Sequence, residues 1–77
     1  MIFTPQPEIV RGLSMWGAYR DGYTFMISMD REHDDEIRAS VKAVDATPFD
    51  KTRIDLGVFP SIQLAIDACR KWRPNAS

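Results

Sequence analysis

Two strand-like stretches, 13–20 and 23–30, are separated only by Asp21-Gly22, and in the second of them Tyr23, Phe25, Ile27 and Met29 alternate with Thr24, Met26, Ser28 and Asp30. Alternation of this kind predicts β-strands that bury one face. Asp-Gly between two such strands predicts a two-residue type I′ turn, because both central residues of that turn need a positive φ. The cross-strand pairs that follow are Arg20 with Tyr23, Ala18 with Phe25, and Trp16 with Ile27. This register puts the bulky residues of both strands on the same face of the hairpin.

Two further strands are predicted after this hairpin, over residues 36–44 and 53–59. A charged connection precedes the first of them, and a loop over 45–52 that contains Pro48 ends it. The residues expected on the buried face are Ile37, Ala39, Val41 and Ala43 in the first strand, and Ile54, Leu56 and Val58 in the second. Those expected on the opposite face of the second strand are Arg53, Asp55 and Gly57.

A helix is predicted after Pro60. Ser61 can act as its N-cap, because a serine hydroxyl accepts a backbone N–H from the first turn. An apolar stripe then recurs at helical spacing through Ile62, Ala65, Ile66, Cys69 and Trp72. Pro74 ends the helix because proline cannot continue it.

Together these elements predict an α+β fold in which a four-stranded antiparallel meander is covered on one face by a C-terminal helix (β-β-β-β-α). The domain is expected to span residues 13–74, with a tail at 75–77. Residues 1–12 are expected to form an extended arm, because Pro5 and Pro7 remove two backbone donors.

Composition adds little to this picture. Ten Lys and Arg against eleven Asp and Glu give a formal charge of −1, which provides no overall attraction to nucleic acid or to an acidic membrane. Cys69 is the only cysteine, so the domain has no internal disulfide, which fits a reducing compartment. No signal peptide or apolar run long enough to span a membrane is present in the sequence, and we expect a cytoplasmic protein.

Three features carry candidate chemistry. The segment 30–36 holds five carboxylates and His33, which can bind a divalent cation, but it lacks the ligand spacing and central glycine of a calcium loop. A solvated turn is the alternative. His33 as a general base has no nucleophile nearby in the sequence, and Cys69 lies on the apolar stripe, where a buried side chain is expected instead of a reactive thiol. We therefore predict a non-enzymatic protein with no catalytic, metal-binding or cofactor-binding residue.

The sheet face opposite the helix is the surface most open to a partner. Met15, Tyr19 and Met26 form an apolar stripe there, which predicts contact with a protein or with a second copy of the chain. On the same face, Arg38, Lys42 and Arg53 predict an alternative, weak binding of nucleic acid through phosphates and base edges. A merely solvated face is the third possibility. No small-molecule ligand is indicated.

Residues 54–68 resemble the end of the AP2-type and arm-type integrase DNA-binding domains, in which a strand with a Leu-Gly-x-Phe pattern precedes an alanine-rich helix. The matching positions are Leu56, Gly57, Phe59, Ser61, Ala65 and Ala68. The resemblance implies that the sheet enters the DNA major groove and that Arg38, Lys42 and Arg53 face the DNA. The chain departs from the family in its additional first strand and its acidic hairpin. As a whole it is similar to the short one-domain proteins common in bacteria.

Overall fold

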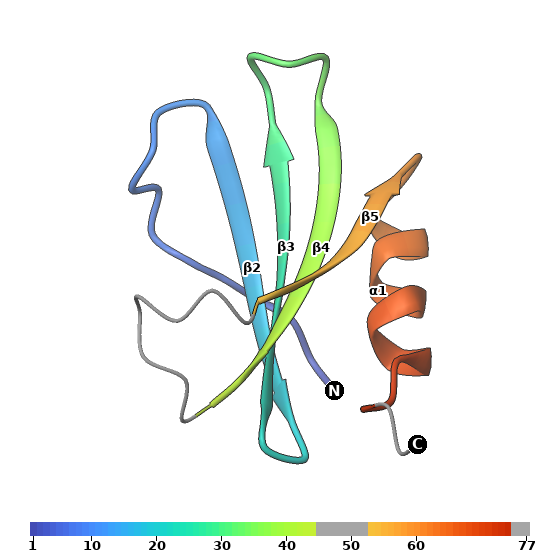
Figure 1. Ribbon diagram of the computed structural model, residues 1–77. Helices are drawn as coiled ribbons and strands as arrows, with labels where there is room; N and C mark the ends of the chain where they lie inside the picture. The colour runs from blue at the N-terminus through green and yellow to red at the C-terminus, as the bar shows by residue number, and fades with distance from the viewer. Residues whose placement is uncertain (45–52, 75–77) are drawn as a thin grey trace.

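The computed structural model describes residues 1–44 and 53–74, in which five antiparallel strands form one sheet and a single helix packs on one of its faces (Figure 1). Each strand pairs with the one that precedes it in the chain, so the order across the sheet is β1-β2-β3-β4-β5. The elements are β1 (Thr4–Pro5), β2 (Leu13–Arg20), β3 (Tyr23–Asp30), β4 (Glu36–Ala43), β5 (Ile54–Phe59) and α1 (Ile62–Lys71). None of the helices within these residues is long and apolar enough to cross a membrane. The predicted loop 45–52 and tail 75–77 lie outside the described residues.

The β2–β3 hairpin confirms the turn and the register expected from the sequence. Asp21 and Gly22 have φ angles of 53° and 85°, which are the positive values that a type I′ turn requires. The observed partners include Arg20 with Tyr23, Ala18 with Phe25, and Trp16 with Ile27. The apolar pattern and the turn thus specify the same pairing.

The expected count of four strands is wrong, because part of the predicted arm forms a fifth strand. In β1, Thr4 lies opposite Gly17 and Pro5 opposite Trp16, and the Gln6 N–H donates to the Met15 carbonyl at 2.9 Å. Two residues are too few for a hydrophobic period, which is why the sequence pattern missed this strand. Pro5 lacks an N–H, which an edge strand tolerates. On the core side of this segment, Met1 and Phe3 pack against the buried cluster.

A second correction concerns β5, where a bulge breaks the expected alternation. The register with β4 shifts between Ala39 and Ser40, so that Val58 lies opposite Arg38 and Phe59 opposite Ile37. Cross-strand partners share a face of the sheet. Val58, which was expected on the helix side, therefore lies on the open face, and Phe59 takes the place on the helix side.

The bulge depends on the backbone of Gly57, whose φ is +110°. Residues with a side chain rarely adopt this conformation. The Gly57 N–H donates to the Asp55 Oδ1 at 2.9 Å, so the backbone donor is satisfied by a side chain of the same strand. Gly57 lies opposite Ala39 on the helix side, where the sequence pattern had expected the other face.

The core confirms that the bulky residues of the strands face the helix. The fully buried residues are Phe25, Ile27, Ala39, Val41, Ala65 and Cys69, and Trp16 and Leu56 pack against them. Ala39, Ala65 and Cys69 are small, so α1 can approach the middle of the sheet closely. Ile54 is the exception, since 47% of its surface is exposed although it lies opposite Val41.

Both ends of α1 are fixed by side chains. The Ser61 hydroxyl accepts the Leu64 N–H at 3.2 Å, as predicted for an N-cap. At the other end, the Arg20 guanidinium donates to the carbonyl oxygens of Cys69 at 3.3 Å, Arg70 at 2.8 Å and Trp72 at 2.5 Å. The Cys69 carbonyl also accepts the Trp72 N–H at 3.3 Å, and carbonyls in the last turn carry the negative end of the helix dipole. Arg20 thereby ties the first hairpin to the end of the helix, a role that the sequence pattern did not reveal.

Gly57→Ala is expected to lower the free energy of unfolding by about 1–3 kcal/mol, because alanine is strained at a φ of +110° although the added methyl group meets no atom within 4 Å. Gly17→Ala is the matched control. Its added carbon would meet only the end of the flexible Gln6 side chain, at 3.1 Å, so we expect a change below about 1 kcal/mol. Urea denaturation of both variants measures the difference. Equal stabilities would contradict this account of the bulge.

Candidate functional site

The open face of the sheet, opposite α1, contains a hollow of about 350 Å³ where β1, β2 and β3 meet. Its lining includes Ile2, Thr4, Gln6, Tyr19, Thr24 and Met26. The lining is therefore mixed in character. Ile2, Tyr19 and Met26 supply apolar surface, and Thr4, Thr24 and Gln6 supply hydroxyl and amide groups. A surface of this kind suits an amphipathic partner.

Gly17 provides the floor of this hollow because it has no side chain. The Gln6 side chain extends over Gly17, and its amide Nε2 donates to the Thr4 carbonyl at 3.1 Å. Thr4 Oγ1 donates to the Gly17 carbonyl at 3.4 Å. The short strand β1 thus forms one wall of the hollow and is held to β2 by side chains as well as by backbone.

The structure brings two of the three residues of the predicted apolar stripe to this hollow. Tyr19 is 64% exposed, and Met26 is half-buried beside it. Met15 lies on the same face opposite Ser28 but does not line the hollow. Ile2, which is 84% exposed, joins the lining, and the sequence analysis missed it. Met1 and Phe3 alternate with Ile2 and Thr4, and this alternation was the only sequence signal that could have placed Ile2 on the open face.

The three predicted cations lie along the other half of the open face. Arg38 and Lys42 point to the same side of β4, and the Arg53 Nη1 donates to the Ser40 Oγ at 2.5 Å. Arg38 is engaged by two carboxylates, with its Nη1 2.5 Å from the Asp55 Oδ2 and its Nη2 3.2 Å from the Glu36 Oε1. Part of the positive charge on this face is therefore already neutralised.

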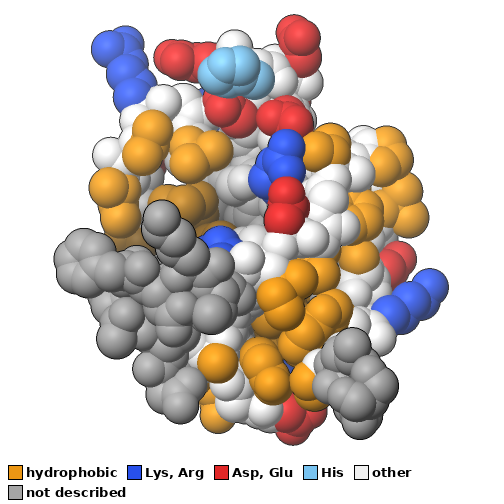
Figure 2. All heavy atoms as spheres, viewed as in Figure 1, with side chains coloured by type: hydrophobic (Ala, Val, Ile, Leu, Met, Phe, Trp, Pro, Cys, Tyr) orange, Lys and Arg blue, Asp and Glu red, His pale blue; other side chains and the backbone are white. Residues whose placement is uncertain are grey.

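The Asp55 carboxylate is fixed from two sides. Its pKa lies below the ordinary value because the Gly57 N–H donates to it and because Arg38 stands beside it, and the pKa of Arg38 is raised in turn. Figure 2 shows Lys or Arg side chains next to Asp or Glu side chains, with hydrophobic side chains gathered on either side of them. The charged pairs thus divide the apolar surface of this view.

The acidic connection between β3 and β4 is organised by its own hydrogen bonds. The His33 Nδ1 lies 2.7 Å from the Asp30 Oδ2, and the Asp30 Oδ1 accepts the Glu32 N–H at 3.0 Å. Asp34 and Asp35 have φ angles of 56° and 55°, a conformation that aspartate tolerates better than most residues. Within residues 1–44 and 53–74, no group of three or more His, Cys, Asp or Glu side chains is placed to hold a metal ion.

Cys69 is fully buried in the core, as its position on the apolar stripe predicted. Burial raises the pKa of its thiol to about 11, an effect that the nearby Arg20 partly opposes. The side chain therefore serves as a small apolar residue.

Comparison with protein-family models, with curated proteins and with solved structures finds no match to this chain. The resemblance of residues 54–68 to the AP2-type domains therefore stays a prediction that depends on those residues alone.

The Cys69 thiol is expected to react with Ellman's reagent at pH 8 only when the protein unfolds. With a pKa of about 11, roughly one thiol in a thousand is ionised at this pH, and burial blocks the reagent as well. Labelling in buffer and in 6 M guanidinium chloride measures the contrast, which we expect to exceed about a hundredfold in rate. Fast labelling of the folded protein would contradict the burial of this side chain.

Proposed function

We propose that this protein is a non-enzymatic interaction module that binds another protein chain through the open face of its sheet. The supporting observation is the hollow of about 350 Å³, beside which Tyr19 and Ile2 expose 64% and 84% of their surfaces. Aromatic and apolar side chains around a depression, with hydroxyl and amide groups among them, match the usual anatomy of a protein interface.

The face is favoured over the sheet edges because both edges carry features that oppose strand addition. At one edge, Pro5 lacks a backbone donor and β1 contains only two residues. At the other edge, the bulge distorts β5 and the Gly57 N–H is occupied by Asp55. Short edge strands, prolines and bulges are common protections against edge-to-edge pairing.

We infer a cytoplasmic location for this activity. The domain has a single cysteine, which is buried and unpaired, and so its stability depends on apolar packing and not on disulfides. Such a protein suits a reducing compartment.

Photo-cross-linking in the cells that produce the protein tests the proposal. The photoreactive residue p-benzoylphenylalanine replaces Met26 in one variant and the exposed helix residue Gln63 in the control. We expect a discrete cross-linked protein species from position 26 and none from position 63, because only the first position lies on the open face. Tyr19 offers a second position beside the same hollow.

The cross-linked mass identifies the partner, since a product of two chains of 8.8 kDa indicates self-association and any other mass indicates a different protein. Absence of any cross-link from positions 19 and 26, in cells where both variants are folded and produced at normal levels, would contradict the proposal.

A second candidate is nucleic-acid binding by Arg38, Lys42 and Arg53, which is favoured by their position on one face. It predicts that a labelled oligonucleotide, tested both as a duplex and as a single strand, binds at 20 mM salt and that this binding weakens steeply by 200 mM. Lys42→Gln with Arg53→Gln should then lower both the affinity and its salt dependence. The carboxylates that hold Arg38 oppose this function. No binding at 20 mM salt would exclude it.

A further inference from the structure

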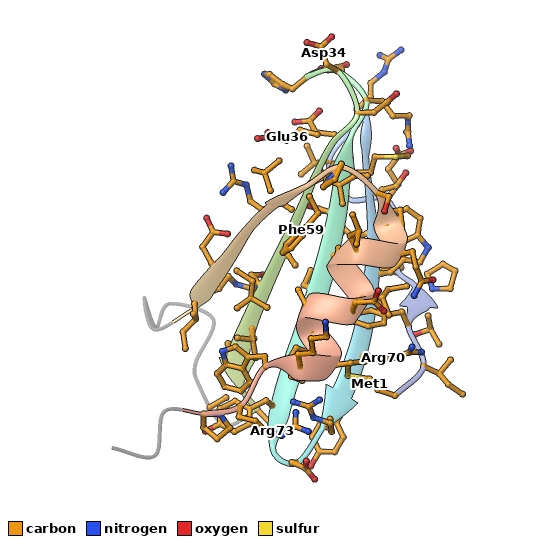
Figure 3. All side chains as sticks on the ribbon, turned by 90° about the vertical axis from the view of Figure 1, so that its right-hand side faces the viewer. Met1, Asp34, Glu36, Phe59, Arg70 and Arg73 are labelled. Atoms are coloured by element: carbon orange, nitrogen blue, oxygen red, sulfur yellow. The ribbon has the colours of Figure 1, made fainter. Side chains whose placement is uncertain are left out.

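Carboxylates outnumber cations at one end of the long axis of this protein, where Arg31 pairs with Glu8. Cations outnumber carboxylates at the other end, where Asp21 lies beside Arg20. Asp34 and Glu36 lie at one end of the molecule, and Arg70 and Arg73 lie at the other (Figure 3). Glu32 and Asp35 belong to the acidic end by their position in the connection between β3 and β4. The formal net charge is nevertheless only −1, so two copies repel each other weakly overall while their opposite ends attract.

This separation extends to the open face. Along β4, Glu36 lies opposite Asp30 and Lys42 opposite Thr24, which are six residues apart on β3. At the rise of a β-strand, the two levels are separated by about 20 Å. Arg53 precedes Ile54, which lies opposite Val41, so it joins Lys42 at the basic end. Midway between the two levels lie the half-buried apolar residues Met15 and Met26.

From this arrangement we propose that the partner of the open face is a second copy of the chain, bound face to face with its strands antiparallel to those of the first. This deepens the proposed function and rests on it. A twofold axis in the plane of the interface and perpendicular to the strands exchanges the two ends of the molecule. Glu36 and the acidic connection of each copy then lie over Lys42 of the other, while Met15 and Met26 meet their own counterparts near the axis.

Symmetry doubles each favourable charge contact, because an isologous interface repeats every pair. The opposite orientation, with parallel strands, would place one acidic end against the other. The charge distribution therefore selects the antiparallel arrangement.

The dimensions of the molecule allow such a dimer. The molecule measures 37 × 26 × 21 Å, and sheets pack through their broad faces. A rectangle of the two longer dimensions covers roughly 960 Å², an upper bound for this face that exceeds the ~800 Å² per partner of a standard stable interface.

A charge exchange tests the orientation directly. The acidic-end variant combines Glu32→Lys and Glu36→Lys with Asp34→Asn and Asp35→Asn, which changes the formal charge of residues 30–36 from −4 to +2. Asparagine is used at positions 34 and 35 because it tolerates the positive φ of both. The basic-end variant combines Lys42→Glu with Arg53→Glu. Sedimentation equilibrium of the wild-type chain, of each variant and of their equimolar mixture gives the dissociation constants, and circular dichroism verifies that each variant is folded.

We expect the wild-type chain to dimerise and each variant alone to bind itself about tenfold more weakly or worse, because like charges then meet twice. The mixture should recover wild-type affinity to within about threefold, since each altered end meets its complement in the heterodimer. Raising the salt concentration should weaken the wild-type dimer, which gives a second measurement if a variant fails to fold.

Two results would overturn the proposal. One is a wild-type chain that stays monomeric at millimolar concentration. In that case, a cross-link from the photoreactive residue at position 26 to a different protein would still support the proposed function. The other is a dimer that is tightened by the acidic-end substitutions or by salt, because only ends of like charge in contact give that outcome.

Discussion

The close contact between α1 and the middle of the sheet determines most of this structure. Ala39 on the central part of β4 and Ala65 and Cys69 on the helix are all fully buried, and their small side chains bring the two layers together. Larger residues of the neighbouring strand β3, such as Phe25 and Ile27, then fill the space beside them. A domain of this size buries little surface, so its stability depends on this one layer of packing.

The single helix also decides which surface remains for a partner. Because α1 covers one face, the other face of the sheet stays open. On that face, residues of β1 and its neighbours form the hollow next to Tyr19 and Met26. One edge of the sheet carries Pro5 in β1, and the other edge carries the bulge in β5. The proposed self-association uses the same architecture, in which charges at opposite ends of the strands would give a second copy a preferred direction.

Much of the fold could be predicted from the sequence, because local rules and the hydrophobic pattern agree there. The turn at Asp21-Gly22 and the cap at Ser61 each depend on a few neighbouring residues, and the predicted pairings and cap are observed. The two errors have a different physical origin. β1 is too short for a period, and the bulge at Gly57 depends on a backbone conformation that no alternation pattern encodes.

The candidate site was less predictable than the fold. Tyr19 and Met26 follow from the strand period, whereas Ile2 and Gln6 reach the hollow only because β1 folds back onto β2. The pairing of Arg38 with Asp55 likewise depends on the register after the bulge. Contacts that join segments remote in sequence are absent from any local pattern.

The hydrogen bonds from Arg20 to the end of α1 have a consequence for folding during translation. The Arg20 guanidinium binds carbonyl groups that lie about fifty residues further along the chain, at Cys69, Arg70 and Trp72. During translation, the hairpin of β2 and β3 is complete long before those carbonyls leave the ribosome. Phe25 and Ile27 then stay uncovered on the nascent chain, and the ordered domain forms only after residues 62–72 have emerged. A chaperone that shields nascent apolar strands would have its longest opportunity to bind in that interval.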